Sequence, residues 1–163
     1  MVLRRLPRMS RTKQFLVAFA TGVVALATAA SATARGLSGS ESSLLRAINT
    51  ARTSRGLTAL RVDRSLERTA RRHSSDMLRG GYFSHGRFAA RMRASGARGP
   101  TFGEDLAWGP VDAQWVVSEW LASPPHGANL LRPGFHRVGV GALLGTFAGH
   151  SGALVVTADF AGH

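Results

Sequence analysis

Three short blocks of this chain each set one metal-binding or proton-transferring side chain among glycines, prolines and large apolar residues. These side chains are His85, Glu104 and His126. Glycine and proline interrupt helices and strands, so we expect all three on loops or at element ends, where chemistry meets solvent. Two imidazoles and a carboxylate suit a divalent transition metal, zinc first. The sequence predicts a site with His85 and His126 as metal ligands and Glu104 fixing the tautomer of His85.

Two other interpretations of these residues stay open. In a metal-assisted hydrolase, Glu104 would be the base for a water held between the two histidines. In a structural module, the three side chains would form a hydrogen-bonded network tying loops to a sheet. The chain has no Gly-x-Ser-x-Gly elbow, His-Glu-x-x-His helix, phosphate loop or cysteine, so the pattern favours binding over catalysis. His73, at a core-facing helical position, is predicted to be an interior histidine.

The first 34 residues differ from the rest of the chain. Their basic residues are Arg4, Arg5, Arg8, Arg11 and Lys13, with no acid among them. Residues 15–30 are apolar, and residues 30–34 offer small-x-small cleavage sites at Ala32 and Ala34, which predicts a signal peptide over 1–34. A membrane anchor is the alternative, but the apolar run is shorter than the ~20 residues of a span. We therefore expect a secreted protein, extracellular or cell-wall associated, with no transmembrane segment after processing.

The part of the chain that we expect to be exported is basic and has no cysteine. Residues 1–34 hold five of the 21 basic residues and none of the nine acids, which leaves a formal charge of +7 on the remainder. Its arginines would draw it to anionic surfaces. They are scattered and lack interleaved aromatic residues, so we expect no specific nucleic-acid partner. Without cysteine there are no disulfides, and stability must come from the core.

The order of periodic segments indicates an α+β fold. Helices are predicted around 44–51, 63–80, 88–95 and 116–121, the last ending at Pro124-Pro125. Strands are predicted at 102–108, 135–144 and 153–160, the last two joined by a long glycine-rich loop over 145–152. Helices on both faces of a small antiparallel sheet give a three-layer α-β-α sandwich. We assign residues 35–42 to a short flexible lead-in and 43–163 to the domain.

These motifs, in this order, strongly resemble the CAP superfamily, which joins cysteine-rich secretory proteins, antigen 5 and pathogenesis-related proteins. Its module is also called the SCP domain. The resemblance is carried by Gly81-Tyr82-Phe83-Ser84-His85-Gly86, Phe102-Gly103-Glu104-Asp105-Leu106-Ala107-Trp108-Gly109, Trp120-Leu121-Ala122-Ser123-Pro124-Pro125-His126-Gly127-Ala128-Asn129-Leu130-Leu131, Gly139-Val140-Gly141 and Thr157-Ala158-Asp159-Phe160. It covers roughly residues 40–160 and is closest to a cysteine-free bacterial branch. It implies the same three-layer fold.

The resemblance also implies a cleft of two histidines and two acids. Carried onto this chain, its positions are His85, Glu104, Ser123 and His126. Ser123 stands where the family has its second acid, and Asp105 replaces a usual asparagine, so the charge in the cleft differs. The resemblance implies a secreted protein that binds a small hydrophobic ligand, such as a lipid, or a cell-envelope component, and that takes up zinc or another divalent ion. The alternatives are a metal-assisted hydrolase of peptide or envelope polymer, with Glu104 catalytic, and a structural surface module.

Overall fold

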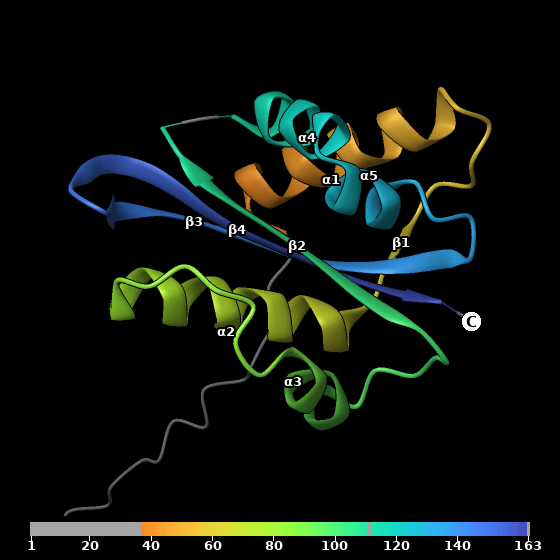
Figure 1. Ribbon diagram of the computed structural model, residues 1–163, viewed down its shortest axis with the longest axis horizontal. Helices are drawn as coiled ribbons and strands as arrows, with labels where there is room; N and C mark the ends of the chain where they lie inside the picture. Colours follow the sequence, from red (N-terminus) through yellow and green to blue (C-terminus); the bar gives the residue numbers. More distant parts are fainter. Residues whose placement is uncertain (1–36, 111, 163) are drawn as a thin grey trace, which may run out of the picture. The chain divides into compact units, whose positions relative to one another are not determined.

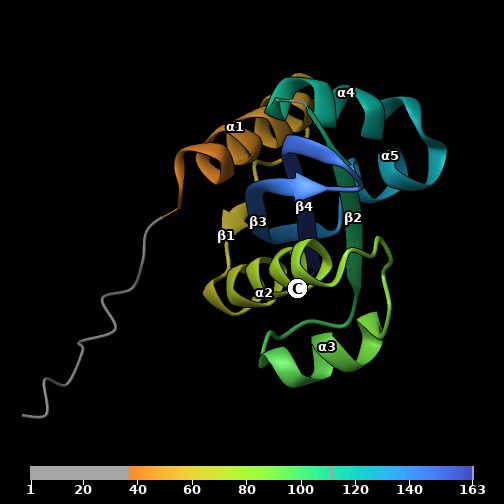
Figure 2. The same ribbon diagram turned by 90° about the vertical axis from the view of Figure 1, so that its left-hand side faces the viewer.

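A four-stranded sheet lies between two layers of helices in the computed structural model, which describes residues 37–110 and 112–162. The elements in chain order are α1 Gly39–Thr53, β1 Arg61–Val62, α2 Arg64–Gly80, α3 Phe88–Ser95, β2 Phe102–Gly109, α4 Ala113–Ala122, α5 Pro124–Leu130, β3 Phe135–Phe147 and β4 His150–Gly162. Helices α1, α4 and α5 cover one face of the sheet, and α2 and α3 cover the other (Figure 1, Figure 2). The predicted three-layer α+β fold is confirmed. The predicted signal peptide lies outside the described residues.

The sheet is mixed rather than purely antiparallel. Its strand order is β1-β3-β4-β2, in which β4 pairs antiparallel with both β3 and β2. Strand β1 pairs with β3 in parallel through Arg61 and Val62. The sequence prediction missed β1 because two residues are too short to show a strand period. Strand β2, which carries Glu104, is an edge of the sheet.

The hairpin of β3 and β4 is longer than predicted, and the predicted loop over 145–152 is wrong. Phe147 pairs with His150, so only two residues form the turn. Ala148 and Gly149 both have positive φ, at 49° and 83°. Positive φ at both central positions is the type I′ geometry, whose twist matches that of paired strands. The small and polar residues that favoured a loop are instead the outer ends of two paired strands.

Helix boundaries follow their capping residues. Asp63 caps α2 by accepting from the N–H groups of Ser65 and Leu66, and Gly81 ends it at φ 64°, as predicted. Ser38 and Glu41 form a capping box that starts α1 at Gly39. Residues 39–42 are therefore helical, and the prediction of a flexible lead-in through residue 42 is wrong for them.

Helix α5 was not predicted. The sequence analysis took Pro124-Pro125 only as the end of α4, but the same two prolines occupy the first turn of α5. Proline fits there because the first-turn N–H groups have no intrahelical partner. His126 consequently lies on a helix rather than on a loop.

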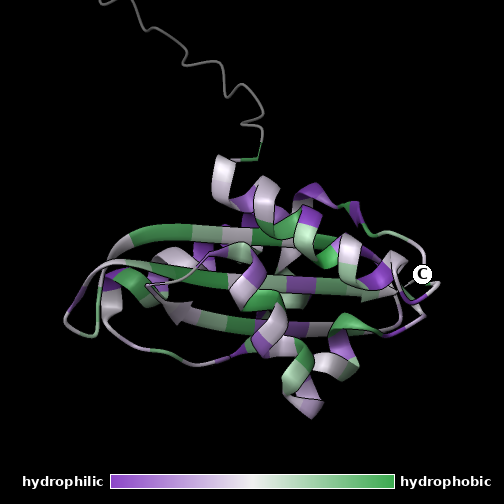
Figure 3. Cartoon of the chain, turned by 90° about the horizontal axis from the view of Figure 1, so that it is seen from above, coloured by the Kyte–Doolittle hydropathy of each residue, from purple (hydrophilic) through white to green (hydrophobic). Residues whose placement is uncertain are grey.

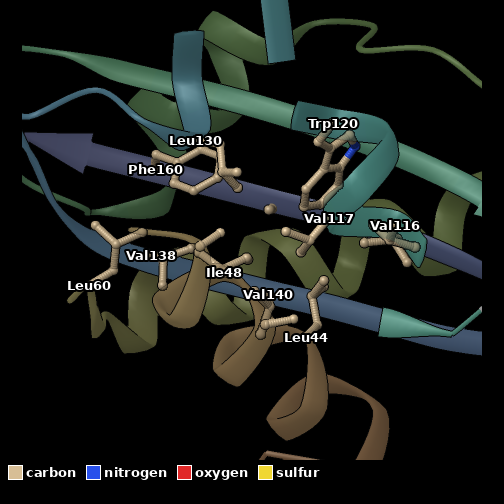
Figure 4. Packing of buried hydrophobic residues seen from close by; sticks show 14 of the residues in the cluster. Leu44, Ile48, Leu60, Val116, Val117, Trp120, Leu130, Val138, Val140 and Phe160 are labelled. Carbon is tan, nitrogen blue, oxygen red and sulfur yellow. The ribbon is translucent and has the colours of Figure 1, made fainter. Parts of the chain in front are cut away.

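The larger core cluster lies between the sheet and the layer of α1 and α4. It includes Ile48, Val116, Trp120 and Phe160 (Figure 4). Hydrophobic stretches run along the long strands between helices of mixed colour (Figure 3). On the opposite face, a Cβ at Gly139 would lie 2.0 Å from the carbonyl carbon of Leu66. The missing side chain thus lets α2 rest directly against β3.

A buried arginine ties the α1 layer to the chain around β3. Arg52 is fully buried, and its guanidinium donates to the carbonyl oxygens of Thr58, Leu130, Arg132 and Phe135 at 2.8–3.1 Å. Burial lowers its pKa. Across residues 37–110 and 112–162, no helix has the length and apolar character needed to cross a membrane.

Candidate functional site

Glu104 is the centre of a polar cluster under α2 and α3. Side chains alternate along β2, and Glu104 faces these two helices while its neighbours Gly103 and Asp105 face α5. The Glu104 side chain is only 2% exposed. Its Oε1 lies 2.7 Å from Nδ1 of His85, and its Oε2 pairs with Nη2 of Arg91. Each oxygen of the carboxylate therefore already has a partner.

His73 fixes the segment that carries His85. Its Nε2 lies 3.0 Å from the carbonyl oxygen of Ser84, and a carbonyl only accepts, so Nε2 carries the proton. The same atom is 3.9 Å from Oε2 of Glu104. Burial lowers the pKa of His73, and the Arg91 cation lowers it further. The interior histidine predicted from the sequence is confirmed, since His73 is buried.

Asp159 adds a second acid beside Glu104. The two residues are opposite each other on β4 and β2, and Asp159 is fully buried. As a carboxylate it would have no hydrogen-bond donor among the described residues. Burial raises its pKa well above the usual value, and the neighbouring Glu104 raises it further. Burial and the neighbouring Glu104 thus both favour the protonated form of Asp159, while Glu104 is the ion-pair partner of Arg91.

Asp105 lies on the opposite face of β2. Its Oδ1 accepts from Nδ2 of Asn129 on α5 at 2.9 Å, and its Oδ2 has no described partner. Burial raises the pKa of Asp105 to about 7, partly offset by the Asn129 hydrogen bond. Asn129 also donates to the backbone carbonyl of Glu104 at 3.3 Å. Asn129 thus joins α5 to the strand that carries the site.

Of the four predicted positions, the structure joins His85 and Glu104 in direct contact. His126 is half-buried on α5, and its pKa is lowered by burial and then by His85. Ser123 lies between α4 and α5, where its backbone N–H donates to Glu119 and Trp120 and its carbonyl accepts from Gly127. These are backbone roles only. Ser123 therefore does not supply the second acid that the family resemblance places at this position, because serine has no carboxylate.

The residues present give an incomplete donor set for a metal. In the part of the chain that the structure describes, no group of three or more His, Asp, Glu or Cys side chains is arranged to hold an ion. Glu104 already contacts an imidazole and a guanidinium, so the donors left are the rings of His85 and His126. Zinc sites normally use three or four protein ligands. Zinc binding stays a prediction, and the function proposed for this site does not require a metal.

The segment that carries His85 is exposed and holds two aromatic residues. The His85 side chain is 54% exposed, and Tyr82 and Phe83 on the same segment are 42% and 44% exposed. Large aromatic residues usually lose most of their exposure on folding. An imidazole held by a buried acid and two uncovered aromatic residues therefore lie on one short segment between α2 and α3.

Three residues of this cluster were not predicted as site residues: Arg91, Asn129 and Asp159. Asp159 gave a usable signal, since it is an acid inside an otherwise apolar strand. Arg91 gave none, because it is one of many arginines and only the packing of α3 aims it at Glu104. Asn129 was visible only as part of a motif, with no hint of its partner.

A mixed sheet between two helical layers, with a histidine and a buried glutamate paired at the edge strand, is the architecture of an SCP domain. The chain belongs to the cysteine-rich secretory protein (CAP) family, whose model matches residues 45–160. This confirms the family resemblance found in the motifs.

Bacterial proteins are among the relatives of this chain. The protein YkwD of Bacillus subtilis, described as uncharacterized, is 34% identical over 106 residues, which are 62% of this chain and 41% of that protein. The chain thus spans less than half the length of this relative. An extracellular SCP-domain protein of Bacillus anthracis is similar in fold, with a TM-score of 0.63 and 24% identity over 79% of this chain and 45% of that one. An outer surface protein of Borrelia burgdorferi gives a TM-score of 0.62 and 22% identity over 72% and 87%.

Proposed function

We propose that this protein is exported and binds an amphipathic component of the cell envelope, a lipid first, at the surface around His85. One observation carries the proposal: the exposed pair Tyr82 and Phe83 is separated only by Ser84 from an exposed imidazole that a buried glutamate holds in place. The aromatic rings offer apolar contact, and the imidazoles of His85 and His126 offer polar contact. A ligand with an apolar part beside a polar group fits both.

The same geometry favours binding over turnover. Glu104 is buried and each of its oxygens already has a partner, His85 or Arg91, which favours an orienting role for it over a role as a general base. What it does is orient the ring of His85. Orientation of a polar contact next to apolar surface is the task of a binding site.

Export to the envelope is part of the proposal. It is supported by the sequence of residues 1–34 and by relatives described as an extracellular protein and an outer surface protein. N-terminal sequencing of the protein recovered from culture medium tests it. We expect a first residue of Thr33 or Arg35, and protein that still starts at Met1 and partitions with membrane would contradict export.

Ligand binding is tested with a fluorescent fatty acid and, separately, with soluble muropeptides. We expect the fatty acid to bind, and the double variant Tyr82→Ala/Phe83→Ala to bind it at least about tenfold more weakly, because two aromatic contacts are lost. Trp115→Ala is the matched control, since Trp115 is 45% exposed but lies on α4. Equal loss in the control, or binding of muropeptides alone, would contradict a lipid site at His85.

A hydrolase is the second candidate, and one feature favours it. With Nδ1 of His85 held by Glu104, Nε2 of the exposed ring has no described partner and is free to accept a proton from water. In this version His85 is the base and Glu104 only orients it, as the acid does in a catalytic triad. Glu104→Gln would then reduce turnover by about 10²-fold or more.

A further inference from the structure

A second site is suggested by an open cavity between α2 and α3, which adjoins the His85 site through Arg91. Its volume is about 630 Å³. The α2 side is formed by Arg68, Arg72 and Asp76, which are spaced so that they share one face of that helix. The α3 side is formed by Arg87 and Arg91. Four arginines thus face one cavity that holds a single acid.

Most of this positive charge has no counter-charge in the described residues. The side chains of Arg72 and Arg87 form no ion pair or hydrogen bond there, and Arg68 contacts only the hydroxyl of Ser65, at 3.1 Å. The single acid, Asp76, is already paired with Arg79 at 2.8 Å. Like charges held close together repel each other, so folding alone gives no reason to gather them.

One further feature makes the cavity suitable for an anion. Helix α3 starts at Phe88, its N-cap Arg87 makes no capping side-chain hydrogen bond, and no acid lies in its first turn. The positive end of this helix, at the cavity-lining residue Arg87, is therefore uncompensated.

The apolar packing of α3 explains why the cavity stays open. Met92 is buried with Leu66 and Ala161, and Phe88 packs against the same cluster. These contacts hold one face of α3 against α2 and the sheet end. The adjacent face of α3, with Arg87, Ala90, Arg91 and Ala94, is therefore left opposite the arginines of α2.

We propose that this cavity binds a phosphate-bearing ligand. Guanidinium groups bind phosphate through paired N–H donors, and arginine is the usual residue for this recognition. Ser65 and Thr69 also line the cavity, which supplies neutral hydroxyls near the charges. The volume exceeds that of a phosphate ion and leaves room for a ligand with a polar group beyond the phosphate, such as a polyol. Such a group comes either as a soluble phosphate ester or as the headgroup of an anionic lipid.

Calorimetric titration of the purified protein with glycerol 3-phosphate, inorganic phosphate and uncharged glycerol tests the proposal. A second arm measures binding to phosphatidylcholine vesicles with and without phosphatidylglycerol. The test variant is Arg68→Gln/Arg72→Gln, which changes two exposed side chains and leaves Arg91 on Glu104. The matched control is Arg46→Gln/Arg61→Gln, which removes the same charge from exposed positions away from the cavity. Arg87→Gln is a third variant that changes only the α3 side.

We expect glycerol to show no binding and the phosphate probes to bind. In the Arg68→Gln/Arg72→Gln variant the affinity should fall at least about tenfold, with a smaller fall in Arg87→Gln and none in the control. Binding of soluble glycerol 3-phosphate identifies a free ester as the source, and binding only to phosphatidylglycerol vesicles identifies a headgroup. Equal losses in the control would show a response to net charge and overturn the site. Absence of binding to every phosphate probe would overturn it too.

Discussion

The substitution Asp105→Asn tests the electrostatics of β2. Asp105 is fully buried, one of its oxygens accepts from Asn129, and the other has no partner in the described residues. Burial raises its pKa from 3.8 to about 7. Asparagine has nearly the same shape, keeps an oxygen for Asn129, and carries no charge at any pH.

The size of the effect follows from this pKa. Below pH 3.8 the side chain is protonated in both the folded and the unfolded chain. As the pH rises, the unfolded chain loses this proton first, so the folded state loses stability until the pH passes about 7. The loss is about 1.4 kcal/mol for each pH unit in this window. Between pH 5 and pH 8 the wild-type protein should therefore lose about 3 kcal/mol that the variant does not lose.

Chemical denaturation of both proteins at pH 5 and pH 8 measures this difference. Asp159 also has a raised pKa, but it is present in both proteins and its contribution cancels. Asp76→Asn is the control, since it makes the same chemical change at an acid whose side chain is 41% exposed. Parallel profiles for wild type and Asp105→Asn would refute the reasoning, because they would show that Asp105 is already ionised at pH 5 in the folded protein.

Three further predictions concern the core and the histidines. Gly139→Ala should lower the free energy of unfolding by about 3 kcal/mol or more, since its Cβ would overlap the α2 backbone. Gly39→Ala, with open space around it, should be nearly neutral. Similar melting temperatures for the two variants would contradict the close approach of α2 to β3. Arg52→Met should cost at least about 3 kcal/mol, because buried carbonyls lose their donors, and an unchanged denaturation midpoint would contradict this. Calorimetric titration should show weak zinc binding, and this binding should be lost in His85→Ala and in His126→Ala. Binding should also be lost as acid protonates the imidazoles, and His126 should protonate at a lower pH than a free imidazole because its pKa is lowered. Unchanged binding in both variants would show that the ion binds elsewhere.

Much of the fold could be predicted because its signals are local. The cap at Asp63, the αL glycine Gly81 and the apolar face of α2 each depend on neighbouring residues only. The failures depend on tertiary context. The two-residue strand β1 exists because β3 lies beside it, and residues 145–152 form strand ends because a type I′ turn at Ala148-Gly149 lets pairing continue.

The site was predicted in outline and not in its pairing. His85 and Glu104 were identified by type and position, and the structure joins them at 2.7 Å. The sequence could not show that Arg91 occupies the second oxygen of Glu104, because that contact depends on how α3 packs. Nor could it show that Asp159 is opposite Glu104, because strand register is set by pairing between distant segments. With these two contacts, Glu104, which the sequence analysis considered as a base, is instead a buried residue that orients the ring of His85.

The most direct test of binding without turnover is mass spectrometry of the ligand after contact with the protein. The purified protein is incubated with envelope lipids and, separately, with peptidoglycan fragments, and the bound and free molecules are then recovered. We predict that a lipid is retained and that every recovered mass is unchanged, in the wild type and in Glu104→Gln alike. Product masses that appear with the wild type and with Arg46→Gln, but not with Glu104→Gln or His126→Ala, would contradict the account and establish a hydrolase.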